Sequence, residues 1–184
     1  MTRIDPQNFT TLLDTIAQRR SAGDETVSAE SSTRILAPEV RAANIPQEVK
    51  DAVQPAETGM LNQLVHTGAT ASEDAQRVLA GAIDADAFGD RISQLMDSAI
   101  TQFGQLQDST TAKLRALGNQ HPDWQQTIIS VFQAVNNLLL NALDTECDFL
   151  TLLVSDTPHQ AGRVNTFFGD LVSRIEDGWS QIVG

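Results

Sequence analysis

The chain has 184 residues, a formal net charge of −12 and one cysteine. This length suits one domain with a core of its own, and a single cysteine excludes an internal disulfide. A surface this acidic repels phosphate backbones and anionic lipids, so we expect no nucleic-acid partner. No apolar run approaches the length of a membrane span, and the first residues lack the apolar stretch of a signal peptide.

The first predicted helix lies near residues 6–20. Asp5 can cap it, and Pro6 suits its first position. Its apolar side chains recur at the spacing of one helix face: Phe9, Leu12, Leu13 and Ile16. Two placements are open for this helix. It packs on the chain's own bundle, or it docks on a partner while tethered to the rest of the chain.

The region that follows is polar and rich in proline. Four of the six prolines lie before residue 60, and residues 21–33 are mostly Ser, Thr, Ala and acidic residues. Such a tract buries too little apolar surface to offset the entropy of ordering it. We therefore predict a flexible N-terminal arm over residues 1–60 and a helical bundle over residues 61–184.

Short helices are predicted around this boundary. One starts at Pro46 and ends before Pro55, because proline lacks the N–H that a helix interior needs. A second runs from about residue 57 to 67. Ser72 and the two acidic residues after it are expected to open a third, since acidic side chains suit the first turn of a helix.

Three long amphipathic stretches fill the chain from Phe88 onward, and tight breaks at 118–122 and 155–158 separate them. In the first stretch, apolar residues step by four and three as in a coiled coil. We expect its polar run at 107–111 to bend or break the helix and Gly118 to cap its end. The second stretch, which includes Leu139, is apolar on several faces and should be the most buried.

The third stretch carries an apolar stripe that includes Phe168 and ends at Trp179 and Ile182. Long helices joined by short connections fold back on one another. The predicted fold is therefore all-α: an antiparallel helical bundle of three long helices plus shorter helices, with an extended N-terminal arm.

No motif of catalytic, cofactor or metal chemistry is present. The histidines stand far apart, without the spacing of a helical metal site: His66, His121 and His159. Cys147 lies between two carboxylates, which raise the pKa of a thiol and oppose its use as a nucleophile. We therefore predict that the protein is not an enzyme and has no cofactor or metal site.

One acidic group needs a separate interpretation. Asp84, Asp86 and Asp90 alternate with other residues as at the start of a calcium loop, but the glycine is one place early and the closing glutamate is missing. Acidic residues at the beginning of a helix explain the group, because they favour the positive end of the helix dipole.

Residues 114–121 resemble the helix that carries the haem-ligating histidine in globins, with Leu114 and Leu117 seven and four residues before His121. The resemblance implies a ligand-binding helical domain with globin-like packing. Ala71 and Ile92 stand where globins carry a phenylalanine and the distal histidine, so haem is not implied.

The favoured function is non-enzymatic protein–protein interaction or assembly, as a structural subunit, an adaptor or a secreted helical factor such as a bacterial secretion-system substrate. The partner is another protein or a second copy of the chain. The side chains expected to bind it are apolar and lie on the first and last helices: Phe9, Leu12, Leu13, Ile16, Trp179 and Ile182. The expected location is the cytoplasm, or outside it after export without a cleaved signal peptide.

Overall fold

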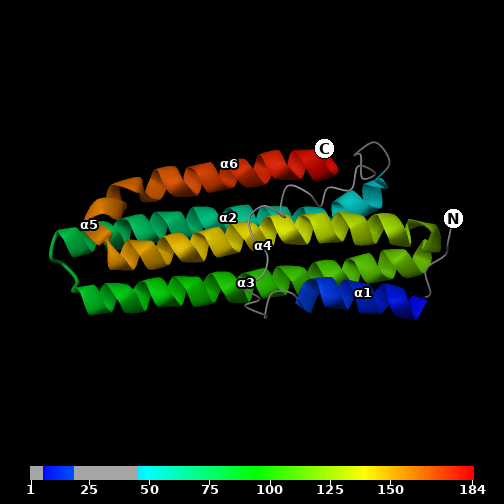
Figure 1. The fold of residues 1–184 in the computed structure, drawn as a ribbon, viewed down its shortest axis with the longest axis horizontal. Coiled ribbons are helices and arrows are strands. Elements are labelled where there is room, and N and C mark those ends of the chain that lie inside the picture. Colours follow the sequence, from blue (N-terminus) through cyan, green and yellow to red (C-terminus); the bar gives the residue numbers. More distant parts are fainter. Residues whose placement is uncertain (1–5, 19–44) are drawn as a thin grey trace.

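The computed structural model describes residues 6–18 and 45–184. All regular structure in these residues is helical, and Figure 1 shows four long helices side by side, each antiparallel to the next around the bundle. The all-α antiparallel bundle is confirmed. Its helices, with two short helical turns at Pro122–Trp124 and Ala161–Arg163, are α1 (Pro6–Gln18), α2 (Gln47–Leu79), α3 (Ala85–Gln120), α4 (Gln125–Ser155), α5 (Thr157–Gln160) and α6 (Val164–Val183).

Helix α4 is at the centre of the arrangement. It contacts α2 across the bundle, with α3 on one side of this pair and α6 on the other. The short α1 lies on α3 and α4, at the end of the molecule where the chain turns from α3 into α4 (Figure 1). Of its two expected placements, α1 therefore takes the one on its own bundle.

The prediction of short helices between residues 45 and 84 is wrong. A single helix, α2, runs through Pro55, whose side chain is exposed while Val53 and Ala56 on either side of it are buried. Packing of these neighbours holds the helix together across the hydrogen bond that proline cannot make. The expected boundary at residue 60 thus falls inside α2, and residues 47–60 belong to the bundle.

Ser72 and Asp74 do not open a helix either. Both are buried inside α2, where Asp74 pairs with Arg91 of α3 at 2.8 Å and with Arg77 at 3.5 Å. A buried carboxylate is tolerated when such partners compensate for its lost hydration. Asp5 and the polar tract at 21–33 lie outside the described residues.

Two expectations about α3 are also corrected. The polar run at 107–111 neither bends nor breaks the helix, because Gln107 is buried and its Nε2 donates a hydrogen bond to Oδ1 of Asn136 on α4. Gly118 is not a cap, since the helix continues to Gln120. A Cβ on Gly118 would lie 2.3 Å from the ring of Phe9, so the glycine is there to let α1 approach.

Other local predictions agree with the structure. Asp84 is the N-cap of α3, and its side chain accepts a 2.7 Å hydrogen bond from the amide of Ala87. Leu139 and Phe168 are buried in the core. None of the described helices has both the length and the apolarity needed to cross a membrane.

The globin-like packing implied by residues 114–121 is absent. The long helices run nearly along one axis (Figure 1), whereas globin helices cross at about 50°. His121 ends α3, and its ring stacks on Trp124 with a centroid distance of 3.8 Å.

Candidate functional site

Helices α3 and α4 pack against each other along a seam whose register two contacts define. Gln107 pairs with Asn136. Eighteen residues away on each helix, Gly89 faces Val154, because a Cβ on Gly89 would lie 3.8 Å from Cγ1 of Val154. The two helices therefore keep one antiparallel register over residues 89–107 and 136–154.

Helix α1 covers the end of this α3–α4 seam nearest to the connection between the two helices. Phe9, Leu13 and Ile16 are buried in it, while Leu12 remains 43% exposed. Polar contacts fix the position of α1: Arg115 of α3 pairs with Asp14, and Nδ2 of Asn136 donates to the carbonyl of Ile16 at 3.2 Å. The coverage thus runs from Gly118 to the Gln107–Asn136 pair.

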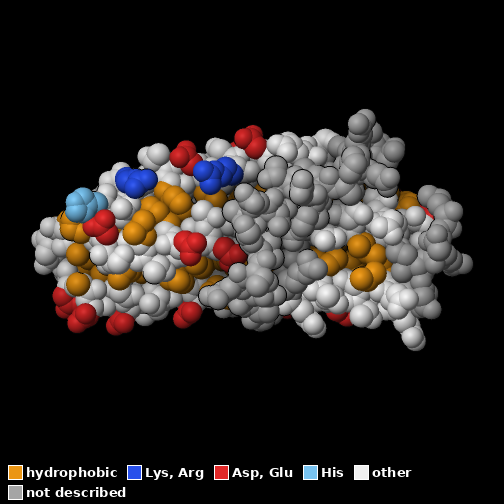
Figure 2. All heavy atoms as spheres, viewed as in Figure 1, with side chains coloured by type: hydrophobic (Ala, Val, Ile, Leu, Met, Phe, Trp, Pro, Cys, Tyr) orange, Lys and Arg blue, Asp and Glu red, His pale blue; other side chains and the backbone are white. Residues whose placement is uncertain are grey.

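Beyond that pair α1 no longer covers the seam, and among the described residues we call positions 89–107 and 136–154 the open seam. On the sides of the two helices that carry the Gln107–Asn136 and Gly89–Val154 contacts, Ile100 is 48% exposed and Val154 38%, while Met96, Leu140 and Cys147 are half-buried. Leu152, which is 45% exposed, lies on another side of α4. Where Figure 2 shows this face, at the left of the view, hydrophobic side chains lie over α3 and α4 with acidic side chains on both sides of them.

The open seam is acidic. Helix α4 contains no Lys or Arg, and α3 has none between Arg91 and Lys113. Exposed carboxylates stand along it instead: Asp97, Asp144 and Asp148. Partial burial and the charge of Asp148 both raise the pKa of Asp144. Burial and the neighbouring carboxylates raise the pKa of the Cys147 thiol to about 11, so this thiol stays protonated near neutral pH and is a poor nucleophile.

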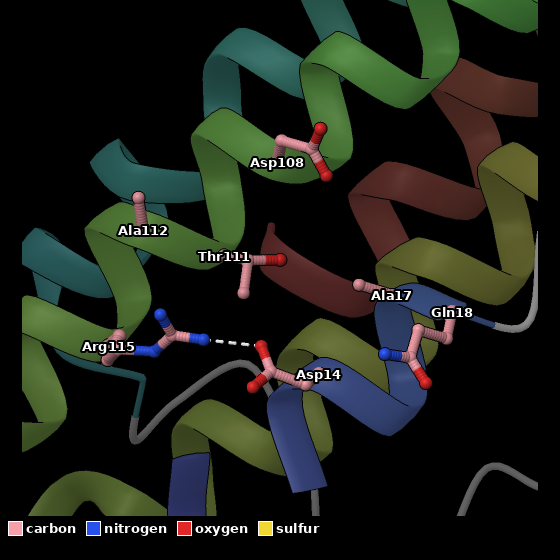
Figure 3. Close-up of a pocket in the computed structure, with 7 residues that line it drawn as sticks. All are labelled: Asp14, Ala17, Gln18, Asp108, Thr111, Ala112 and Arg115. Carbon is pink, nitrogen blue, oxygen red and sulfur yellow. Dashed lines mark hydrogen bonds and ion pairs between the residues drawn. The ribbon is translucent and has the colours of Figure 1, made fainter. Parts of the chain in front are cut away.

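A hollow of about 580 Å³ lies where α1 meets α3 (Figure 3). The Asp14–Arg115 ion pair crosses it, and the other side chains around it are small or polar: Ala17, Gln18, Asp108, Thr111 and Ala112. Small-molecule sites are usually lined by large apolar and aromatic side chains, whereas the apolar side chains around this hollow are only those of Ala17 and Ala112. We interpret it as an imperfect fit of α1 on α3.

Buried polar groups also form hydrogen bonds between α2 and α4. Nε2 of Gln63 donates to Oε1 of Glu146 at 2.7 Å and to Oγ1 of Thr67 at 2.9 Å. Glu146 is completely buried, and this burial raises its pKa to about 7, against the opposing effect of hydrogen bonds from Gln63 and Thr67. Among the described residues, Oε2 of Glu146 and Oε1 of Gln63 have no hydrogen-bond partner. Since no solvent reaches Glu146, the group is placed to affect stability and not to act on a substrate.

Within residues 6–18 and 45–184, no group of His, Cys, Asp and Glu side chains could hold a metal ion. The predicted partner-binding residues belong to two places that the fold keeps apart, since α1 packs on α3 and α4 while α6 packs on α2 and α4. Leu12 alone among them is exposed. The others are buried in the chain's own core: Phe9, Leu13, Ile16, Trp179 and Ile182.

Comparisons with known proteins found no similarity: no family model, no curated protein and no solved structure matches this chain. The geometry of the bundle is therefore the basis on which its function is argued.

Proposed function

We propose that this chain is a non-enzymatic protein–protein interaction module that binds amphipathic helices along its α3–α4 seam. The observation that carries this proposal is the docking of α1, which buries Phe9, Leu13 and Ile16 on that seam. Anchors at i, i+4 and i+7 are also the means by which helical peptides bind grooves on other proteins. In this proposal, α1 occupies the seam in the free chain, and a helix of a partner replaces it during assembly.

The way α1 is attached supports its replacement. It has 13 residues, and an isolated helix of this length is marginal in water. Twenty-eight residues of sequence separate Gln18 from Gln47. Its principal contacts are with α3 and α4, so α2 and α6 keep their packing when α1 leaves.

Polar atoms at the same interface weaken it. Oε1 of Gln107, Oγ1 of Thr111 and Nε of Arg115 are buried without a hydrogen-bond partner among the described residues. Each such atom costs about 1–3 kcal/mol of lost hydration. The Asp14–Arg115 pair is partly exposed, and such pairs contribute only about 0–1 kcal/mol. A better-fitting helix can therefore compete with α1.

Replacing Phe9 with Asp should free the covered end of the seam. The substitution puts a carboxylate into the apolar contact with Gly118 that the Phe9 ring now makes, so α1 is expected to undock. A fluorescent peptide of residues 6–18 should then bind the Phe9→Asp chain at least about tenfold more tightly than the wild type, whose seam is occupied. Fluorescence anisotropy measures this difference.

Leu12→Asp is the matched control, because it makes the same change of charge on the exposed side of the same helix. This variant should bind the peptide as weakly as the wild type. Circular dichroism checks that both variants keep the bundle. If the folded Phe9→Asp chain binds the peptide no better than the Leu12→Asp chain, the seam does not accept helices and the proposal fails.

A further inference from the structure

We infer that the open seam binds a basic amphipathic helix of a different protein, which lies in line with α1. This inference rests on the proposed function, since both require a helix to lie along the α3–α4 seam. It adds that a second position exists while α1 stays docked, and it specifies the chemistry of the partner.

Continuity with α1 is the first argument. The carbonyl of Ile16, near the end of α1, accepts a hydrogen bond from Asn136, which is also where the open seam begins. From there to Val154 the register of α3 and α4 does not change. At 1.5 Å per residue, 18 residues of each helix give an open length of about 27 Å, which suits a partner helix of about 18 residues.

The apolar surface is the second argument. In this register Val154 is exposed at one end of the stripe, half-buried Met96 and Cys147 follow, and exposed Ile100 comes next, with half-buried Leu140 beyond it. Single exposed apolar residues are common on proteins, but apolar side chains gathered in one patch mark an interaction surface. A helix laid on this row would bury it, as α1 buries the other end of the seam (Figures 1 and 2).

Charge decides the kind of partner. The carboxylates of Asp97, Asp144 and Asp148 flank the row, and α4 offers no Lys or Arg to balance them. A second copy would bring its own acidic seam and a formal net charge of −12, so like charges would oppose pairing. A helix with Lys or Arg beside its apolar stripe has the complementary charge, and its binding should weaken as salt screens the attraction.

The test uses the full chain and an 18-residue amphipathic peptide of Leu and Lys that carries a photoreactive group. Anisotropy should show binding that weakens with salt, and cross-links should fall in residues 89–107 and 136–154 with α1 still docked. A peptide with Glu in place of each Lys should not bind. The complex should contain one copy of the chain by light scattering.

Two pairs of variants localise the contact. Ile100→Ser with Val154→Ser should weaken binding about tenfold or more, because burial of apolar area is lost. Val65→Ser with Leu79→Ser, at exposed apolar positions of α2, should leave it unchanged. Asp144→Asn with Asp148→Asn should reduce both the affinity and its salt dependence, while Asp51→Asn with Glu73→Gln on α2 should not.

Three outcomes would overturn the inference. Cross-links at the α1-covered end, with release of α1, would support the proposed function but remove the second position. Equal effects of the seam and α2 variants would show general attraction to an acidic surface. A complex that contains two copies of the chain would make self-association, not a foreign helix, the use of this surface.

Discussion

Phe168→Ala is expected to lower the free energy of unfolding by about 3–5 kcal/mol, as for other large aromatic side chains removed from a core. Phe168 belongs to α6, is 4% exposed and packs against Gly68 of α2. Its ring also meets Phe149 of α4 edge-on, with a centroid distance of 6.0 Å. One side chain thus joins three helices, and its removal leaves a cavity that these helices could close only by shifting toward one another. Urea unfolding followed by circular dichroism measures the loss.

The contact with Gly68 gives this prediction a second measurement. A Cβ at position 68 would lie 2.8 Å from Cγ of Phe168, so Gly68→Ala should destabilise the wild type. In the Phe168→Ala background the same Cβ enters vacated space, and the higher helix propensity of Ala adds up to about 1 kcal/mol. The two substitutions should therefore couple by more than about 1 kcal/mol in a double-mutant cycle.

Gly169→Ala is the matched control, because Gly169 also lies inside a helix but has open space where its Cβ would be. It should be neutral or mildly stabilising in both backgrounds. Additive effects of Gly68→Ala and Phe168→Ala would contradict the packing of α6 on α2 described above.

Apolar periodicity was enough to locate α4, α6 and the buried face of α1, because each of these stripes repeats at the spacing of a helix and faces the core. The helix start at the acidic group of Asp84 and Asp86 was equally local, and the structure adds that Asp84 caps it by accepting from the amide of Ala87 one turn away. These features depend on residues that are close together in the sequence, so they can be predicted without knowing the tertiary fold.

The wrong predictions concern residues whose role depends on a contact with another helix. From the local sequence alone Asp74 indicates a helix start, but in the structure it is buried inside α2 and pairs with Arg91 of α3. Gln107 likewise indicates a break in α3, but it donates a hydrogen bond to Asn136 of α4 and the helix continues. A polar residue inside a bundle is tolerated when another helix satisfies it, and that helix is not apparent from the local sequence. The local sequence predicts a cap at Gly118 for the same reason, because only the position of Phe9 explains this glycine.

Predicting the open seam from the sequence would require two facts about contacts between helices. These are which faces of α3 and α4 meet, and where α1 ends on them. One signal of the open seam is visible in the sequence, since residues 125–155 contain no Lys or Arg. That absence acquires a location only when the register of α3 on α4 places Asp144 and Asp148 beside an exposed apolar row. The partner-binding residues predicted from periodicity were instead the most regular apolar stripes, and regular stripes of this kind are the ones that a bundle buries.

The second large effect concerns the pH dependence of stability. Glu146 is completely buried between α4 and α2, and the described residues place no cation beside it. Its pKa is about 7 in the folded chain and 4.5 in a solvated one, because burial disfavours the charged carboxylate. Between these two values the folded state binds more protons than the unfolded state. Stability therefore falls as the pH rises from about 4.5 to about 7, and the loss is complete above pH 7.

The expected size follows from the shift, since each pKa unit corresponds to about 1.4 kcal/mol, which gives a loss of about 3 kcal/mol at neutral pH. Glu146→Gln keeps an acceptor for Gln63 but cannot ionise, so it should be more stable than the wild type by about this amount near pH 8 and equal to it near pH 4.5. Urea unfolding of both proteins across this range measures the difference.

Glu73→Gln, the same change at an exposed position of α2, should keep the wild-type profile. Raised pKa values at Asp144 and Glu57 leave a smaller slope of the same sign in the Glu146→Gln chain. If the Glu146→Gln and wild-type profiles run parallel instead, the carboxyl is hydrated in solution and the contact between α2 and α4 is looser than described.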